Sequence, residues 1–334
     1  MIKAANIPTS FILKLCTMIF FLAIILWRID YNIFWQTITS SDLLFVVLPA
    51  IIFFPSQLLG AYRWYFLLKL LNCRLHFWPV FRYNILGQFA ALFLPGQISG
   101  DIVRAIAITK GQEDKSVFVL SIIIDKLSML IAISLFATLG IFLSTVLVGF
   151  FAVGLFSLVI LISILLVFIM TCRYRGGRIS RYISRVDEIL PLYLRNKLVM
   201  IYGGRSVPRV SFSAMAIILW LGVGSQLLNT IGIAMLAYGL HIVIRPIDWV
   251  AINAVVSIVQ ILPISIGGLG VREGAFAGIL SLYAVPIEQS TACSLIGFVL
   301  LALLLLCCWI VLDAGYSRSK WFMRFRRLKR HEVR

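Results

Sequence analysis

The residues best suited to chemistry lie in two short segments that interrupt long apolar runs. Residues 263–274 read PISIGGLGVREG, and residues 94–105 read LPGQISGDIVRA. Each segment combines helix-breaking proline and glycine with an arginine and a carboxylate. A helix that begins after such a break directs free N–H groups and the positive end of its dipole toward the break. With an arginine beside it, such a helix start is suited to binding a phosphate.

Each break is followed by a charged pair that opens the next predicted helix. The helix-breaking residues are Pro95, Gly96 and Gly100 in one segment and Pro263, Gly267, Gly268 and Gly270 in the other. Asp101 and Arg104 are spaced i,i+3 and share one helix face, and Arg272 and Glu273 are adjacent. The alternative to a binding site is a tight re-entrant turn in which Arg272 and Glu273 only neutralise each other, because proline and glycine are frequent in membrane helices.

Asp125 and Lys126 lie inside the apolar run 117–142. At a rise of 1.5 Å per residue, Asp125 is about 13 Å deep, close to the middle of a bilayer. Charged groups at that depth normally face a bundle interior and have a partner. The candidate partners are Arg104 or Arg272 for Asp125, and Asp101 or Glu273 for Lys126. A structural ion pair and a contact with substrate are both open.

The candidate substrate-binding residues are therefore Asp101, Arg104, Asp125, Lys126, Arg272 and Glu273. Amides also lie in the apolar runs: Gln226 and Asn229 share one helix face, and Asn253 and Gln260 share another. Hydrogen bonds between helices explain such amides without a ligand, and we favour that interpretation.

Metal binding and catalysis lack a suitable constellation in the sequence. The six cysteines and three histidines show no metal-ligand spacing, so we expect no metal ion and no cofactor. Four acidic residues fall in predicted outside loops without forming a DxD pair: Asp30, Asp42, Asp248 and Glu288. We therefore expect a protein that is not an enzyme.

The composition predicts an integral membrane protein. Hydrophobic residues make up 61% of the 334 residues and charged residues 13%, and the mean hydropathy is +1.03. Soluble domains are about half apolar and a quarter charged. The net charge of +17 collects in the connections and the tail, which favours anionic lipid headgroups over nucleic acid as partners.

Apolar runs predict an all-α polytopic fold with about six full spans and two broken helical hairpins. The spans are 11–27, 43–62, 117–142, 147–171, 211–238 and 293–312, and the broken regions are 83–109 and 249–285. The half before each break is short for a crossing, so each broken region is expected to re-enter or to cross twice.

The distribution of Lys and Arg predicts that both termini are cytoplasmic. The predicted inside connections 63–82, 172–210 and 316–334 are rich in these residues, whereas the outside connections 28–42, 143–146, 239–248 and 286–292 are not. On this map the two broken regions open from opposite sides, as in transporters with inverted repeats.

We expect one transmembrane domain over residues 1–315 that contains the basic cytoplasmic loop 172–210. Residues 316–334 are expected to form a basic amphipathic cytoplasmic tail, because aromatic and basic residues alternate in it. Such a segment is typical of contact with anionic lipid.

Four motifs carry a resemblance to a known family: YRWYFLLKLL at 62–71, LPGQISGDIVR at 94–104, IIIDKL at 122–127 and PISIGGLGVREGAF at 263–276. They resemble the flippase-like membrane domain of lysylphosphatidylglycerol synthases, over about residues 15–315. The resemblance implies movement of lipids or polyprenyl-phosphate-linked sugars between leaflets of a bacterial cytoplasmic (inner) membrane. It implies that the prolines, glycines and charged residues of the two breaks, together with Asp125, are core positions.

Two positions depart from the family pattern. Many relatives have a basic residue where this chain has Gln97, and arginine where it has Lys126. The largest hydrophilic stretch, 172–210, is too short for the aminoacyl-transferase domain of the full synthases, so lipid aminoacylation is not expected.

Transbilayer transport of an anionic lipid, or of a polyprenyl-phosphate-linked substrate, by alternating access is the leading hypothesis. The alternatives are a membrane enzyme that acts on a lipid-linked substrate and a non-transporting accessory subunit of a lipid or glycan pathway. Membrane lipids with anionic headgroups are the expected partners. A homo-oligomer and a partner enzyme of such a pathway are left open.

Overall fold

The structure is a computed structural model that describes residues 30–73, 75–94, 98–109, 115–144, 146–147, 151–173, 210–261 and 265–331. Several predictions concern residues outside these ranges. The residues concerned are the span 11–27, Pro95, Gly96, Gln97, Pro263 and nearly all of the loop 172–210.

The described chain is all-helical, which confirms the predicted fold class. Its helices are α2 (Tyr31–Thr39), α3 (Leu43–Leu70), α4 (Phe77–Phe93), α5 (Ile98–Thr109), α6 (Lys115–Leu143), α7 (Phe151–Arg173), α10 (Phe212–Gly239), α11 (Pro246–Ile261), α12 (Val271–Leu280), the short 3₁₀ helix η2 (Ser281–Tyr283) and α13 (Ile287–His331). Within the described ranges, α3, α6, α10 and α13 contain segments long and apolar enough to cross a membrane. The protein is therefore a multi-pass membrane protein.

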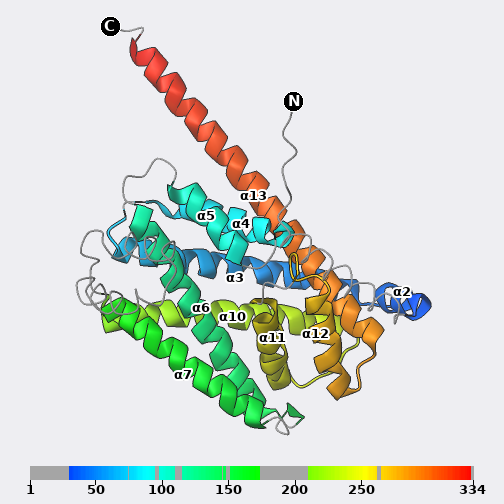
Figure 1. Cartoon of the computed structure of the whole chain (residues 1–334). Helices are drawn as coiled ribbons and strands as arrows, with labels where there is room; N and C mark the ends of the chain where they lie inside the picture. Colours follow the sequence, from blue (N-terminus) through cyan, green and yellow to red (C-terminus); the bar gives the residue numbers. More distant parts are fainter. Residues whose placement is uncertain are drawn as a thin grey trace, which may run out of the picture.

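Two similar units make up most of the fold (Figure 1). The first is α3 to α6, and the second is α10 to α13; each is a long helix, a pair of shorter helices and another long helix. The units meet through α6 and α11, where Gly140 lies against Ala251, and through α3 and α10. The helices α3 and α10 are antiparallel: Gly232 lies against Phe53, and Gly222 lies against Arg63. Small residues at such a contact let two helix backbones approach closely.

The first broken region forms an antiparallel hairpin of α4 and α5. Gly87 and Gly100 bring the two backbones together, and a methyl group on Gly100 would overlap the Gly87 carbonyl. Further along, the Arg104 guanidinium donates to Asn84 of α4. In the second broken region, α11 and α12 form a similar hairpin, in which Gly268 lies against Gln260.

The two hairpins approach from opposite ends of the α3–α10 pair, as predicted. The open end of α4–α5 packs against Trp64 and Leu68, near the end of α3. The open end of α11–α12 packs against Leu236 and Leu240, at the end of α10. That end of α10 lies beside the start of α3, where Gly239 contacts Phe45. Phe45 and Trp64 are 19 positions apart on α3 (64 − 45), so the two open ends are about 30 Å apart along it.

The tips of the hairpins touch. The Gly267 N–H donates to the Leu94 carbonyl at 3.5 Å, and a side chain on Gly267 would overlap the Leu92 carbonyl. Gly267, Gly268 and Gly270 have φ of +61°, +77° and +80°, a region that glycine adopts without strain. The glycines of the second break therefore make a turn and allow close contact with the first.

Two predicted connections are wrong in their boundaries. The expected inside connection 63–82 is helical up to Leu70, so Arg63 and Lys69 belong to α3. The expected outside connection 286–292 is mostly the first turns of α13. Both errors have one cause: polar or charged residues next to an apolar run are interpreted as a connection, although none of them breaks the helix.

Replacement of Gly100 by alanine tests the packing of the first hairpin. The added methyl group has no room against Gly87, so α4 and α5 must separate. We expect a destabilisation of about 1–3 kcal/mol. Thermal unfolding of the purified protein in detergent, followed by fluorescence, measures the difference.

Gly278→Ala is the matched control, because a methyl group at that position meets no atom within 4 Å. Its higher helix propensity should leave stability unchanged or raise it by up to about 1 kcal/mol. Equal melting temperatures for the two variants would contradict the close contact between α4 and α5.

Candidate functional site

A cavity of about 300 Å³ lies between the two units and is lined by residues of both hairpins. From the first unit it receives Gly100, Asp101, Arg104, Asp125 and Lys126, and from the second Gly267, Gly268 and Arg272. The structure thus brings five of the six predicted site residues to one cavity. The sixth, Glu273, lies behind Arg272 and is fully buried. Irregular backbone at membrane depth is tolerated where it borders such a cavity.

Asp125 is the centre of the first charged cluster. It is 3% exposed and accepts hydrogen bonds from Arg63 Nε at 2.8 Å and Arg104 Nη2 at 2.9 Å. Arg63 comes from α3, Arg104 from α5 and Asp125 from α6, so one carboxylate connects three helices. A buried carboxylate needs such partners because burial of an unpaired charge is very costly.

Asp101 extends this cluster toward the cavity. Its two oxygens pair with Arg104 Nη2 at 3.0 Å and Lys126 Nζ at 3.2 Å. Of the partners left open by the sequence, Arg104 therefore pairs with Asp125, and Asp101 pairs with Lys126. Three cations face two carboxylates in the first cluster, which leaves one positive charge in excess.

Arg63 is the site residue that the sequence reasoning missed. It was assigned to a cytoplasmic connection, but it is 5% exposed and lines the cavity. The signal that could have found it is the absence of proline and glycine from Ala61 to Leu71. A continuous α3 places Arg63 inside the apolar body, where it needs a carboxylate partner.

Three buried N–H donors in the cavity wall have no hydrogen-bond partner among the residues that the structure describes. They are Asn84 Nδ2, Arg104 Nε and Gln226 Nε2. Each belongs to a residue that is no more than 7% exposed. Buried donors are nearly always paired, so a cavity with several unpaired donors is suited to a ligand that accepts hydrogen bonds.

Arg272 and Glu273 form a second cluster that is neutral. Glu273 accepts from Arg272 Nε at 3.0 Å, and Ser294 Oγ of α13 accepts from the same nitrogen at 2.8 Å. Glu273 also accepts from the Gly270 N–H at 2.6 Å, so it caps the start of α12. Arg272 and Glu273 therefore neutralise each other, as the alternative interpretation of this motif predicts. Arg272 nevertheless lines the cavity.

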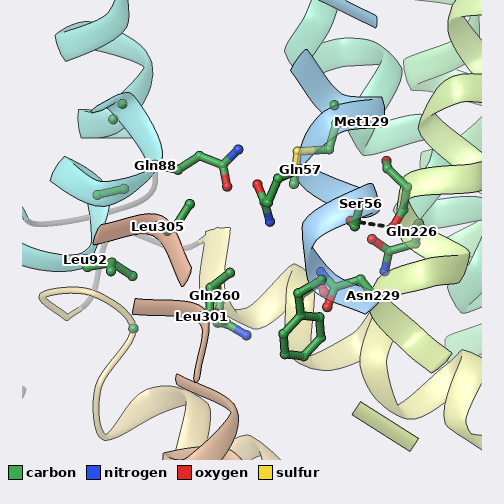
Figure 2. A pocket seen from close by; sticks show the side chains of 18 of the residues that line it. Ser56, Gln57, Gln88, Leu92, Met129, Gln226, Asn229, Gln260, Leu301 and Leu305 are labelled. Carbon is green, nitrogen blue, oxygen red and sulfur yellow. Dashed lines mark hydrogen bonds between the residues drawn. The ribbon is translucent and has the colours of Figure 1, made fainter. Parts of the chain in front are cut away.

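The amides singled out in the sequence also reach the cavity. Asn253 donates to Thr230 of α10 at 2.9 Å, which is the expected hydrogen bond between helices. Gln226, Asn229 and Gln260 line the cavity, and Figure 2 shows their side chains around it. Interhelical hydrogen bonding thus explains Asn253 but leaves the other three amides unexplained.

Metal ligands do not gather in the described part of the chain. No three His, Cys, Asp or Glu side chains there are placed to hold a metal ion. The absence of a metal and of a cofactor remains a prediction.

One family matches nearly the whole sequence. Residues 11–308 match the family described as Lysylphosphatidylglycerol synthase TM region. The chain belongs to this family. No curated protein matches the sequence. The family match confirms the resemblance carried by the four motifs, and the match extends over both helical units and both charged clusters.

A double-mutant cycle on Arg63 and Asp125 tests the first cluster. Asp125→Asn leaves Arg63 buried without its carboxylate and should cost about 3–5 kcal/mol. Arg63→Gln leaves Asp125 paired with Arg104 alone and should cost less. The double variant should be more stable than the sum of the two costs implies, by at least about 1 kcal/mol. Unfolding of the four proteins in detergent gives this coupling.

The pair Arg82 and Asp313 serves as a comparison because its side chains are 24% and 43% exposed. Its coupling should stay below about 1 kcal/mol. A coupling at Arg63 and Asp125 that is no larger would show that Arg63 does not stabilise the buried carboxylate.

Proposed function

We propose that the protein moves a lipid with an anionic headgroup between the two leaflets of a membrane by alternating access. The observation that carries the proposal is one cavity lined by two hairpins that approach from opposite sides. Transporters built from inverted repeats place their substrate between such broken elements.

The charge of the cavity supports an anionic headgroup. Four cations line it, Arg63, Arg104, Lys126 and Arg272. Three carboxylates, Asp101, Asp125 and Glu273, are paired with them. The excess positive charge lies in the first cluster, where the Arg104 Nε donor also has no partner within the described ranges. A phosphate bound at this position would accept charge-assisted hydrogen bonds.

Apolar side chains complete the wall of the cavity. Phe53, Phe276, Leu301 and Leu305 line it together with the polar residues. A lipid substrate needs both kinds of surface, since its headgroup must be solvated by polar groups while its chains stay in an apolar environment. Membership in the Lysylphosphatidylglycerol synthase TM region family, whose name refers to a phospholipid, supports a lipid-related role.

The proposal also covers the type of activity, the partners, the membrane and the orientation of the protein. The protein acts as a transporter and not as an enzyme, and its partners are membrane lipids. It resides in a bacterial cytoplasmic membrane with both termini on the cytoplasmic side. The corrected end of α3 leaves the basic loop 172–210 and the basic tail as the main arguments for this orientation.

Cysteine labelling tests the orientation. In a cysteine-free background, single cysteines at Arg185 and Phe325 should be protected from a membrane-impermeant thiol reagent in intact cells. Cysteines at Thr145 and Gln289 should react. Permeabilised cells provide the control, because all four positions should then be labelled. Labelling of the position at 185 in intact cells would contradict the proposed orientation.

A reconstituted exchange assay tests transport. The purified protein in vesicles should exchange fluorescently labelled phosphatidylglycerol between leaflets, measured by quenching with dithionite, faster than vesicles without protein. Arg104→Gln should reduce the rate at least tenfold because it removes the charged donor from the first cluster. Arg272→Lys should retain part of the rate, since lysine keeps the charge without the planar fork.

Arg82→Gln is the control, since Arg82 is outside the residues that line the cavity. Its rate should equal that of the unchanged protein. Exchange no faster than in empty vesicles, with correctly folded protein, would contradict the transport proposal.

A further inference from the structure

Seven carboxamide side chains line the cavity, and the charged clusters do not account for them. They are Gln57, Asn84, Gln88, Gln226, Asn229, Asn253 and Gln260. They come from α3, α4, α10 and α11, so both units contribute. Amides on facing helices of an apolar bundle are costly unless they find hydrogen-bond partners.

The fold itself satisfies few of these amides. Asn253 is bonded to Thr230, and the Asn84 oxygen accepts from Arg104. Between described residues, the amides of Gln57, Gln88, Asn229 and Gln260 make no hydrogen bond. Asn84 and Gln226 each have a buried N–H donor without a partner. The amides are therefore available to a ligand.

The free amides lie between the two charged clusters. Gln57 is six residues before Arg63 on α3, about 9 Å along the helix axis. Gln88 is one turn beyond Asn84, which contacts Arg104. On the other side, Gln260 contacts Gly268, close to Arg272. Figure 2 shows Gln57, Gln88, Asn229 and Gln260 around one space.

The chemistry of these groups selects the ligand. Each carboxamide both donates and accepts, as does a hydroxyl group, so amides and hydroxyls pair in either direction. A cationic group requires carboxylates instead, and Asp101, Asp125 and Glu273 are already paired with arginine or lysine. A positive headgroup would also meet the excess positive charge of the first cluster.

The volume is compatible with a small polar headgroup. About 300 Å³ lies at the lower end of the range for small-molecule sites. The cavity has room for a phosphate with one small polyhydroxylated group, such as glycerol or a single ring.

We propose that the cavity has two subsites: the phosphate of the lipid binds at Arg63, Asn84 and Arg104, and a neutral polyhydroxyl group binds at the amides Gln57, Gln88, Asn229 and Gln260. This inference rests on the proposed function and specifies its substrate class. The ligand is a phosphate lipid with a small hydroxyl-rich headgroup, and a lysine-bearing headgroup is disfavoured.

Direct binding to the purified full-length chain in neutral detergent tests the subsites without any transport step. The probes are short-chain phosphatidic acid, phosphatidylglycerol, phosphatidylinositol and lysyl-phosphatidylglycerol, titrated while tryptophan fluorescence is recorded. The two polyhydroxylated lipids should bind at least about fivefold more tightly than phosphatidic acid, because each carries hydroxyls for the amides. Lysyl-phosphatidylglycerol should bind more weakly than phosphatidylglycerol.

Three single variants on three helices, Gln57→Leu, Gln88→Leu and Gln260→Leu, separate the subsites. Each should reduce the preference for phosphatidylinositol over phosphatidic acid by about threefold, while the affinity for phosphatidic acid stays the same. Arg104→Gln should weaken all four lipids equally. Gln36→Leu is the control, because Gln36 is an exposed amide of α2 outside the cavity.

Equal binding of phosphatidic acid and the polyhydroxylated lipids would overturn the inference. Tightest binding of the lysyl lipid, or no binding of any probe, would do the same. The exchange assay is independent: selective binding without exchange would contradict the transport proposal and leave the subsites standing. Exchange without a headgroup preference would contradict the subsites alone.

Discussion

The fold depends on one constraint: backbone that leaves helical geometry inside an apolar body must be enclosed by protein or face a polar cavity. The two hairpins meet this constraint together, because the turn of each packs against the turn of the other through Leu92, Leu94 and Gly267. Each break is thus enclosed in part by the other break. The polar cavity beside the tips follows from the same arrangement, since the helices that end there bring their polar residues with them.

The charged residues beside the first break fix the position of its hairpin and also orient hydrogen-bond donors toward the cavity. Asp125 holds Arg63 and Arg104 by ion pairs at 2.8 and 2.9 Å, and so fixes the first hairpin between α3 and α6. With this pairing, Arg104 Nε finds no partner among the described residues and stays available at the cavity. Buried ion pairs contribute little net stability, because desolvation offsets their attraction. Their retention in this position is better explained by the orientation that they give to donors in the cavity wall.

The sequence predicted the architecture well and the individual partners less well. Apolar runs and the Pro-Gly breaks were enough to predict both hairpins and their opposite orientation. The length of an apolar run does not show whether the charged residue that follows it ends the helix or lies inside it. From the sequence, Arg63 is therefore assigned to a connection, whereas the structure places it within α3. Partner choice was also open: Asp125 had two candidate arginines, and only the packing of α5 against α6 selects Arg104. The neutral pairing of Arg272 with Glu273 depends on the capped turn at Gly270, which a sequence pattern does not specify.

The distribution of ion pairs between the two units has a consequence for motion. In the described parts of the chain, the buried pairs each lie within one unit: Arg63 and Arg104 with Asp125 in the first, and Arg272 with Glu273 in the second. The pair that joins the units, Arg82 with Asp313, is partly exposed. Separation of a buried pair costs about 3–5 kcal/mol, whereas an exposed pair contributes about 1 kcal/mol or less. The described ion pairs would therefore stay intact if one unit moved against the other, which is the energetic condition that the proposed rocking between inverted repeats requires.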